Sequence, residues 1–114
     1  MPSASLIKEF EQLVGKENVF SSEADRQSYA YDAAVLKPMI PSLVVRPTEV
    51  EQLGQVVKRC YEEGIPMTVR GSGTNLTGGT IPDCSDTIVI LTTALNRILE
   101  INTEDLYAIV EPGV

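Results

Sequence analysis

Residues 71–80 form a glycine-rich segment, GSGTNLTGGT, in which four glycines fall within nine residues. Glycine adopts positive φ angles without steric cost, so this segment can turn several backbone N–H groups toward one concavity. Such a nest binds anions without needing a lysine. Apolar, β-branched runs at residues 65–70 and 87–91 flank the segment. We therefore expect a loop between two strands.

The spacing of the glycines excludes two common phosphate-binding motifs. A P-loop ends in Gly-Lys followed by Ser or Thr, whereas this segment ends in Gly79-Thr80. A dinucleotide-binding Rossmann motif requires a glycine where Leu76 stands and a helix directly afterwards, which Pro82 opposes. A nest between two strands that holds a pyrophosphate remains, with a long flexible loop as the alternative. Arg70 borders the segment and either contacts phosphate or braces the loop.

A strand, a helix and a second strand precede the glycine-rich segment. Residues 42–46 (SLVVR) are β-rich, and residues 48–51 fit a capping box that opens a helix over residues 49–63, with Gly64 as its stop. The predicted apolar face of this helix consists of Val50, Leu53, Val57 and Cys60. With the strand at residues 65–70, these elements predict a parallel βαβ unit. The glycine-rich loop then leaves at the carboxyl edge of the sheet, where ligands tend to bind.

Residues 1–41 are predicted to be a helical lead-in. Residues 5–14 have helical spacing, with Ser5 as the N-cap and Gly15 as the stop. A second, polar helix is expected to follow the pair of serines before Glu23. The prolines between this helix and residue 42 indicate an extended connector.

Three β-rich runs, residues 87–91, 97–101 and 106–111, follow the glycine-rich segment and are joined by short polar turns. Such tight spacing favours antiparallel pairing, so we expect antiparallel strands after the parallel unit. The Pro-Gly pair at residues 112–113 indicates a turn into a further element. We therefore expect the chain to be the first part of a longer protein.

The chain carries 9 Lys and Arg against 16 Asp and Glu, a net charge of −7, and contains no His. The negative charge opposes binding to nucleic acid, and no apolar run is long enough to insert into a membrane. Without imidazole, Ser-His and Cys-His nucleophile pairs and most catalytic zinc sites are excluded. Cys60 and Cys84 lack metal-ligand spacing, so we expect two free thiols and no metal site. The N-terminus lacks a secretory signal, which predicts a cytoplasmic location.

Several separated motifs resemble FAD-linked oxidases of the vanillyl-alcohol oxidase superfamily. They are PSLVVRPTEV from Pro41, GIPMTVRGSGTNLTGG from Gly64, LNRILEIN from Leu95 and VEPGV from Val110. They occur in the family's order, after a Tyr-x-Tyr-Asp lead-in that ends at Asp32. Within the superfamily, the sequence is most similar to the group that contains the FAD-containing subunit of glycolate oxidase and D-lactate and related D-2-hydroxyacid dehydrogenases.

The resemblance implies an α+β fold, the first part of a PCMH-type FAD-binding domain. It would comprise N-terminal helices, a small parallel βαβ unit and then antiparallel strands. Residues 1–41 would be the lead-in, and residues 42–114 the first FAD-binding subdomain, with the domain truncated at residue 114.

The resemblance also implies a set of FAD-contacting residues. In the family, the loop matching residues 70–76 wraps the FAD pyrophosphate, mainly through the N–H groups of residues 71–75. Pro47 matches a position near the adenine end, and the glycines at 78–79 match positions where the chain passes close to the cofactor. The turn at 112–113 matches one near the flavin. The candidate site consists of Pro47, Arg70, Gly71, Ser72, Gly73, Thr74, Asn75, Leu76, Gly78, Gly79, Pro112 and Gly113.

Covalent members of the superfamily often attach the flavin to a His in or just after this loop, where Thr74 and Asn75 stand here. FAD is therefore expected to bind noncovalently. The implied function is the FAD-binding N-terminal portion of a flavin-dependent oxidoreductase that oxidises a small 2-hydroxy acid of the glycolate or D-lactate type. Its catalytic residues would lie beyond residue 114, so this segment alone is expected to be inactive. Relatives pair with other oxidase subunits, including an iron–sulfur subunit.

Two other functions stay open. One is a stand-alone nucleotide- or anion-binding module without catalysis. The other is a relative of the reductase of cell-wall nucleotide-sugar synthesis, which has a glycine-rich loop in a similar fold. The sequences TGGT at residues 77–80 and LNRIL at residues 95–99 favour the glycolate oxidase group.

Overall fold

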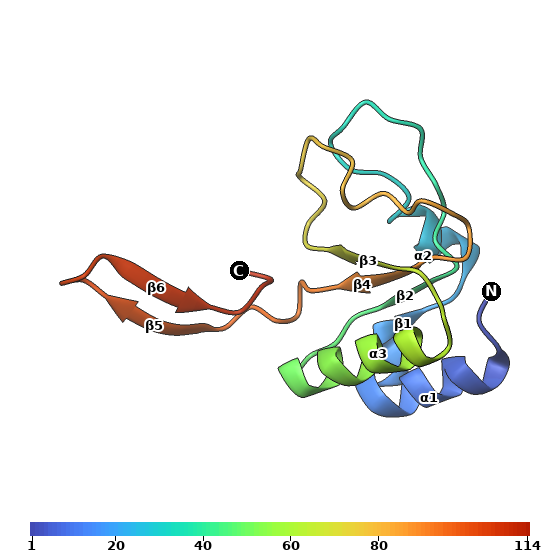
Figure 1. Ribbon diagram of the computed structural model, residues 1–114, viewed down its shortest axis with the longest axis horizontal. Helices are drawn as coiled ribbons and strands as arrows, with labels where there is room; N and C mark the ends of the chain where they lie inside the picture. Colours follow the sequence, from blue (N-terminus) through green and yellow to red (C-terminus); the bar gives the residue numbers. More distant parts are fainter.

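A four-stranded sheet organises the chain in the computed structural model, which describes residues 1–114 (Figure 1). Two helices cover one face of this sheet, loops cover the other, and a separate two-stranded hairpin projects from one end. All the helices and strands expected from the sequence are present, and η1 and β1 are additional. In chain order the elements are α1 (Ala4–Val14), the 3-10 helix η1 (Lys16–Asn18), β1 (Val19–Phe20), α2 (Glu23–Gln27), β2 (Leu43–Val45), α3 (Val50–Glu62), β3 (Met67–Arg70), β4 (Ile88–Leu91), β5 (Ile98–Asn102) and β6 (Tyr107–Val110).

The strands of the sheet are in the order β1-β2-β4-β3. β2 and β3 run parallel to β4, which lies between them, and β1 pairs antiparallel with β2. The parallel βαβ unit of β2, α3 and β3 is thus confirmed. The prediction that residues 87–91 pair antiparallel with the following strands is wrong, because β4 is the central parallel strand. All four residues of β4 are buried, as in a strand covered on both faces, and residues 71–87 provide the crossover that parallel pairing requires.

The helices α1 and α3 bury one face of the sheet. Phe10 of α1 and Val56 of α3 are fully buried in one cluster with Ile88 and Ile90 of β4. The N-terminal elements α1 and β1 therefore share the core of the parallel strands. Packing does not mark the boundary expected at residue 41, which stays a prediction. None of the helices combines the length and the apolar character needed to cross a membrane.

Two helices begin one or two residues away from their predicted starts. α1 begins after Ser3 rather than Ser5, because Ser3 Oγ accepts a hydrogen bond from the Leu6 N–H (3.2 Å). α3 begins after Glu49, which forms a capping box with Gln52, one residue later than expected. In both cases two polar residues within three positions of each other can cap the helix, so residue type alone does not select between them.

The buried face of α3 also differs from the predicted one. Leu53, Val56 and Cys60 pack toward the sheet, whereas Val50 and Val57 are 49% and 37% exposed. Positions 53, 56 and 60 form a helical stripe as regular as the predicted one. Packing against the sheet and α1 selects between the two stripes. Both cysteines are free thiols, as predicted.

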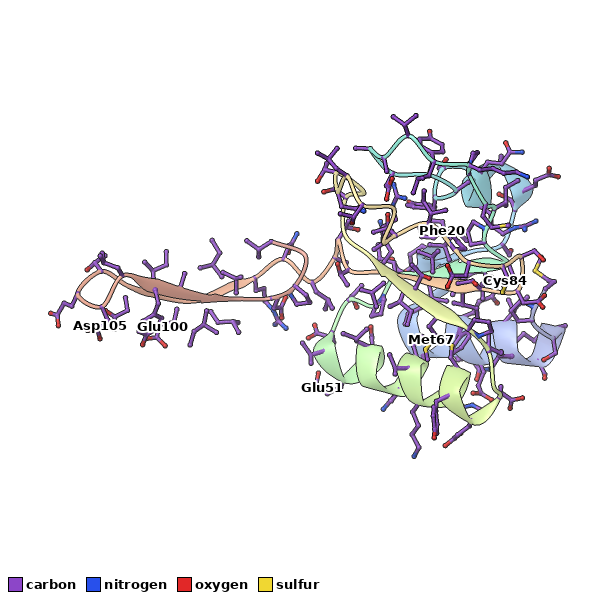
Figure 2. All side chains as sticks on the ribbon, turned by 45° about the horizontal axis from the view of Figure 1, so that its top comes forward. Phe20, Glu51, Met67, Cys84, Glu100 and Asp105 are labelled. Carbon is purple, nitrogen blue, oxygen red and sulfur yellow. The ribbon has the colours of Figure 1, made fainter.

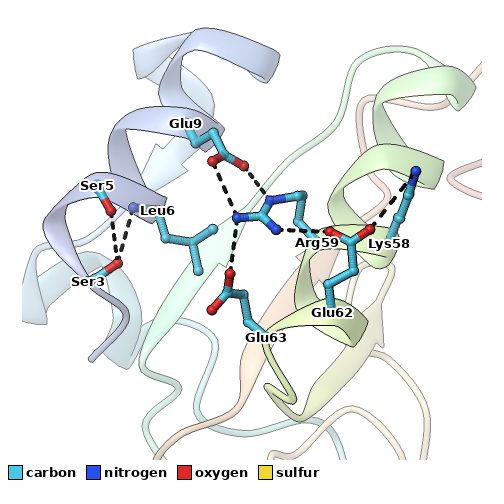
Figure 3. Close-up of polar contacts among 8 residues, drawn as sticks. All are labelled: Ser3, Ser5, Leu6, Glu9, Lys58, Arg59, Glu62 and Glu63. Atoms are coloured by element: carbon cyan, nitrogen blue, oxygen red, sulfur yellow. Dashed lines mark hydrogen bonds and ion pairs between the residues drawn. The ribbon is translucent and has the colours of Figure 1, made fainter.

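Arg59 joins α3 to α1 on the surface (Figure 3). Its Nε donates to Glu9 Oε2 of α1 at 2.6 Å. Its guanidinium also donates to Glu62 (2.9 Å) and Glu63 (3.1 Å) at the end of α3, and these carboxylates raise the pKa of Arg59. A groove of about 450 Å³ beside this cluster is lined by side chains that include these paired charges. Partly exposed ion pairs contribute little stability, so the cluster chiefly orients one helix against the other.

The opposite face of the sheet is covered by aromatic rings and long connections. Phe20 and Tyr29 pack on the side chains of β2 and β4 that face away from the helices, with their ring centroids 6.1 Å apart. Beyond them, residues 28–42 and 71–87 lie side by side and are joined by hydrogen bonds (Figure 1).

β5 and β6 form an antiparallel hairpin, which confirms the pairing predicted for these two runs. Asn102 Oδ1 accepts hydrogen bonds from the N–H groups of Glu104 (3.0 Å) and Asp105 (2.8 Å), which close the turn. The hairpin stands away from the sheet, with Asp105 at its far end (Figure 2). Its apolar side chains are exposed: Ile101 by 66% and Leu106 by 87%.

An ion-pair network fixes the base of the hairpin to the start of α3. Arg97 donates to Glu111 through its Nε (2.9 Å) and its backbone N–H (3.1 Å). Its Nη2 donates to Glu49 (2.9 Å). Glu111 is only 4% exposed, and the hydrogen bonds from the Arg97 side chain and backbone lower the pKa of Glu111. The orientation of the hairpin base is therefore set by Arg97, which precedes β5, and by Glu111, which follows β6.

We expect Phe10→Ala to lower the free energy of unfolding by about 3–5 kcal/mol, because it removes a fully buried ring shared by α1 and the sheet. Tyr61→Ala, which removes a ring 80% exposed on α3, should change it by less than about 0.5 kcal/mol. Urea unfolding followed by circular dichroism measures both. Equal effects of the two substitutions would contradict a core that includes α1.

The lowered pKa of Glu111 predicts a pH-dependent stability. Its charge stabilises the folded protein above the ordinary Glu pKa of about 4.3, and this contribution is lost as the pH falls through the lower folded value. Glu111→Gln should therefore melt below the wild type at neutral pH, with a difference that shrinks in acid below about pH 4. Glu104→Gln, in the exposed hairpin turn, is the control. A difference that persists in strong acid would assign the effect to packing instead.

Candidate functional site

The glycine-rich loop leaves β3 at the carboxyl edge of the parallel strands and surrounds a hollow of about 420 Å³. The hollow is lined by residues 71–75 together with Thr77, Gly79 and Thr80. None of these residues carries a charge or a large apolar side chain. The position predicted for the loop, between two strands and at this edge, is confirmed.

Two glycines of the loop adopt a backbone conformation that other residues avoid. Gly73 has a φ of 73° and Gly78 a φ of 76°. A Cβ on Gly73 would overlap the guanidinium of Arg70, and a Cβ on Gly78 would overlap the side chain of Leu36. The positive φ favours glycine at both positions, and at residue 73 a Cβ would also displace the buried guanidinium of Arg70.

The backbone donors of the loop are open. None of the N–H groups of the nine residues 71–79 donates a hydrogen bond to a backbone carbonyl of the protein. Ser72, Thr74 and Thr77, which also line the hollow, add hydroxyl donors. Backbone N–H groups are strong donors that normally have a partner, so these open donors are compatible with the anion nest expected from the sequence, which stays a prediction.

Arg70 braces the loop from behind. It is 7% exposed, and its Nη1 donates to the carbonyl oxygen of Tyr31 (2.5 Å). Its guanidinium lies over the Tyr29 ring, 5.4 Å from the centroid, and against Gly73. Of the two roles considered for Arg70, bracing is the one that the structure shows. Contact with phosphate stays a prediction.

Asp32 provides a second brace from the connector before β2. Its Oδ2 accepts hydrogen bonds from Asn75 Nδ2 (2.7 Å) and Thr80 Oγ1 (3.3 Å), and its Oδ1 accepts one from the Ala34 N–H (2.7 Å). Burial alone would raise the pKa of Asp32, but these hydrogen bonds outweigh burial and lower the pKa. Asp32 is therefore ionised at neutral pH and serves as an acceptor for residues of the loop.

Thr92 connects the loop to the last turn of the chain. It follows β4, and its N–H (2.8 Å) and Oγ1 (3.2 Å) both donate to the carbonyl oxygen of Arg70. Gly113 packs so closely on it that a Cβ would overlap the Thr92 carbonyl oxygen. The Gly113 N–H donates to the carbonyl oxygen of Leu95 (2.7 Å). The turn at residues 112–113 thus lies beside the start of the glycine-rich loop.

The structure brings most of the predicted site residues to one edge of the sheet. Residues 71–75 and Gly79 line the hollow. Leu76 is 76% exposed, and neither it nor Gly78 belongs to the wall. Pro47 follows β2 at the same carboxyl edge but is fully buried. The predicted residues thus fall into three groups: those that line the hollow, those such as Arg70 that lie outside it against the loop, and Pro47, which is buried at the end of β2.

The candidate site predicted from the sequence omits four residues that hold or line the hollow: Asp32, Thr77, Thr80 and Thr92. Thr80 closes the glycine-rich segment, so its position was a usable signal. Asp32 ends the Tyr-x-Tyr-Asp lead-in, which marked it without indicating a role. Thr92 follows a buried strand, and a polar residue there is a signal for the carboxyl edge of a parallel sheet.

A comparison with protein families matches residues 41–114 to the FAD binding domain. The glycolate oxidase subunit GlcD of Bacillus subtilis (strain 168) is 41% identical over 103 residues, which are 90% of this chain and 22% of that protein. A probable mitochondrial D-lactate dehydrogenase of Danio rerio is 28% identical over 109 residues, which are 96% of this chain and 22% of that protein. The chain spans about a fifth of the length of these curated relatives.

Among solved structures, p-cresol methylhydroxylase with substrate bound superposes with a TM-score of 0.85 and 31% identity, over 96% of this chain and 22% of that chain. The fold is thus that of a PCMH-type FAD-binding domain, as the sequence motifs implied. With its parallel strands, its glycine-rich nest and a family match that covers most of its length, the chain belongs to the FAD binding domain family, whose cofactor is FAD.

Proposed function

We propose that this chain is the FAD-binding N-terminal portion of a flavin-dependent oxidoreductase that oxidises a small 2-hydroxy acid of the glycolate or D-lactate type. The observation that carries the proposal is the row of open backbone donors at residues 71–79, at the carboxyl edge of the parallel strands. The FAD pyrophosphate offers acceptor oxygens and negative charge that such donors bind. Similarity to a glycolate oxidase subunit and a D-lactate dehydrogenase supports the substrate class.

The residues around the hollow fit this cofactor. No charged or bulky side chain lines it, so a pyrophosphate can approach the N–H groups of residues 71–75. In the proposed complex, Arg70 adds positive charge behind this wall, Leu76 flanks it, and the glycines at 78–79 leave room for the cofactor. The turn at 112–113 lies near the flavin and Pro47 near the adenine end.

The chain's own task is to bind and orient the cofactor. When bound, FAD supplies the capacity to take two electrons from the substrate. Because the chain contains no His, we propose that FAD is held noncovalently here. Residues 1–114 contribute no catalytic residue in this proposed enzyme, so the chain alone would be inactive.

The organisation of the whole protein is part of the same proposal. Residues 1–41 are the lead-in and residues 42–114 the first FAD-binding subdomain. The enzyme is cytoplasmic and contains further oxidase subunits, one of them an iron–sulfur subunit. The name of the Bacillus subtilis relative, a subunit of its oxidase, supports a multisubunit enzyme.

A second candidate function is oxidation of an alkylphenol, which the 31% identity and TM-score of 0.85 with p-cresol methylhydroxylase favour. To separate the two, the complete FAD-loaded protein is mixed without oxygen with glycolate, D-lactate or p-cresol. We expect a 2-hydroxy acid to reduce the flavin and abolish its oxidised absorbance. Reduction by p-cresol alone would replace the first candidate with the second.

The nest itself is tested at Gly73. We expect Gly73→Ala in the complete protein to weaken FAD binding about tenfold or more, because its Cβ would overlap Arg70 and oppose the positive φ that aims the N–H groups. Gly54→Ala is the matched control, since a Cβ there has no atom within 4 Å. Quenching of flavin fluorescence measures both affinities. An unchanged affinity for Gly73→Ala would contradict the assignment of the nest.

A further inference from the structure

Asp32 contacts the glycine-rich loop at two positions that line the hollow. Its Oδ2 accepts hydrogen bonds from Asn75 Nδ2 at 2.7 Å and from Thr80 Oγ1 at 3.3 Å. Thr80 Oγ1 also lies 3.2 Å from Asn75 Oδ1. The Thr80 hydroxyl has one proton, so it donates either to Asp32 or to Asn75 at a time, and the three side chains form a triangle of close polar contacts. This triangle fixes the separation of residues 75 and 80, between which the backbone passes through two adjacent glycines.

The connector that carries Asp32 is itself held in place. The Ala34 N–H donates to its other carboxylate oxygen at 2.7 Å. On either side of this bond, the Tyr31 carbonyl accepts from Arg70, and Leu36 lies against Gly78. The connector thus contacts the loop and the preceding Arg70 through three neighbouring positions, and Asp32 is the charged residue that the connector itself contributes.

The loop needs such support from outside. Its glycines lose more conformational entropy on ordering than other residues, and the N–H groups of residues 71–79 form no bonds to backbone carbonyls that would hold its shape. A carboxylate accepts several donors at once, whereas an amide in its place has a single acceptor oxygen and presents N–H groups to the Asn75 donor.

The charge of Asp32 does not disqualify it beside an anion site. Asp32 is not part of the wall of the hollow, and its oxygens are covered by donors from Ala34, Asn75 and Thr80. These donors offset its negative charge, and its side-chain contacts with the loop are those to Asn75 and Thr80.

We propose that Asp32 is a positioning residue that holds residues 75–80 in the shape that binds the FAD pyrophosphate. This inference rests on the proposed function for its ligand. It goes beyond that function in assigning a role to a residue outside the loop and outside the wall of the hollow.

The test compares Asp32→Ala, Asp32→Asn and the milder Thr80→Val in the complete protein. Asp83→Asn is the matched control, an exposed carboxylate in the same connection between β3 and β4. One measurement is FAD affinity by flavin fluorescence. The other is the rate at which thermolysin, which cleaves before large apolar residues, cuts the FAD-free protein between Asn75 and Leu76, a bond that none of these substitutions alters.

We expect Asp32→Ala to weaken FAD binding and to speed cleavage, each about tenfold or more. Asp32→Asn should lie between Asp32→Ala and the wild type in both measurements. Thr80→Val should have the same effects to a smaller extent, and Asp83→Asn none. In the Thr80→Val background, Asp32→Ala should weaken FAD binding less than it does alone, because part of its action passes through Thr80. A general loss of stability would not produce this coupling.

Wild-type FAD affinity together with wild-type cleavage in Asp32→Ala would overturn the inference. Equal and independent effects of Asp32→Ala and Thr80→Val would also overturn it, since the two residues would then act separately. If the wild-type protein binds no FAD, the proposed function fails. The cleavage rates then still decide whether Asp32 holds the loop.

Discussion

The pairing of β4 between β2 and β3 determines where every other part of the chain lies. Its four residues are buried, with Ile88 and Ile90 in the cluster beneath the helices and Val89 and Leu91 in the cluster beneath the loops. Since β4 is parallel to β3, the chain must return from the end of one strand to the start of the other. The glycine-rich loop is part of this crossover. The sheet topology thus forces the loop across the face that the helices leave free.

A crossover without a helix has no internal ladder of hydrogen bonds, so its shape depends on neighbours. The connector before β2 supplies them from one side, through the Tyr31 carbonyl and the carboxylate of Asp32. The end of β4 supplies them from the other side, where Thr92 holds the carbonyl of Arg70. With these outer contacts in place, the N–H groups of residues 71–79 form no hydrogen bonds to backbone carbonyls. The proposed anion nest is a consequence of a loop braced only from outside.

Local patterns predicted every element except η1 and β1, and the place of the glycine-rich loop, but not the contacts between distant residues. Glycine spacing and the preceding βαβ pattern predicted the loop at the carboxyl edge. The same β-rich character of residues 87–91 suited either an antiparallel or a central parallel strand, and burial on both faces decides between them. In α3, the buried apolar face through Val56 and the predicted apolar face through Val57 are equally regular in sequence. Asp32 and Asn75 meet only through the fold, so no local pattern predicts their hydrogen bond.

The position of the hairpin also depends on β4, because the base of the hairpin contacts the residues that follow this strand. Its apolar side chains are exposed, so they do not set its direction. Two sets of contacts at the base set the direction of the hairpin. The Gly113 N–H donates to the carbonyl oxygen of Leu95, and Gly113 packs against the carbonyl oxygen of Thr92. Arg97 pairs with the buried carboxylate of Glu111. Thr92 therefore holds the end of β3 on one side and the end of the hairpin on the other. A shift at Thr92 would move the turn at 112–113 and the start of the glycine-rich loop together, because its N–H and hydroxyl hold the Arg70 carbonyl and Gly113 packs against its carbonyl oxygen.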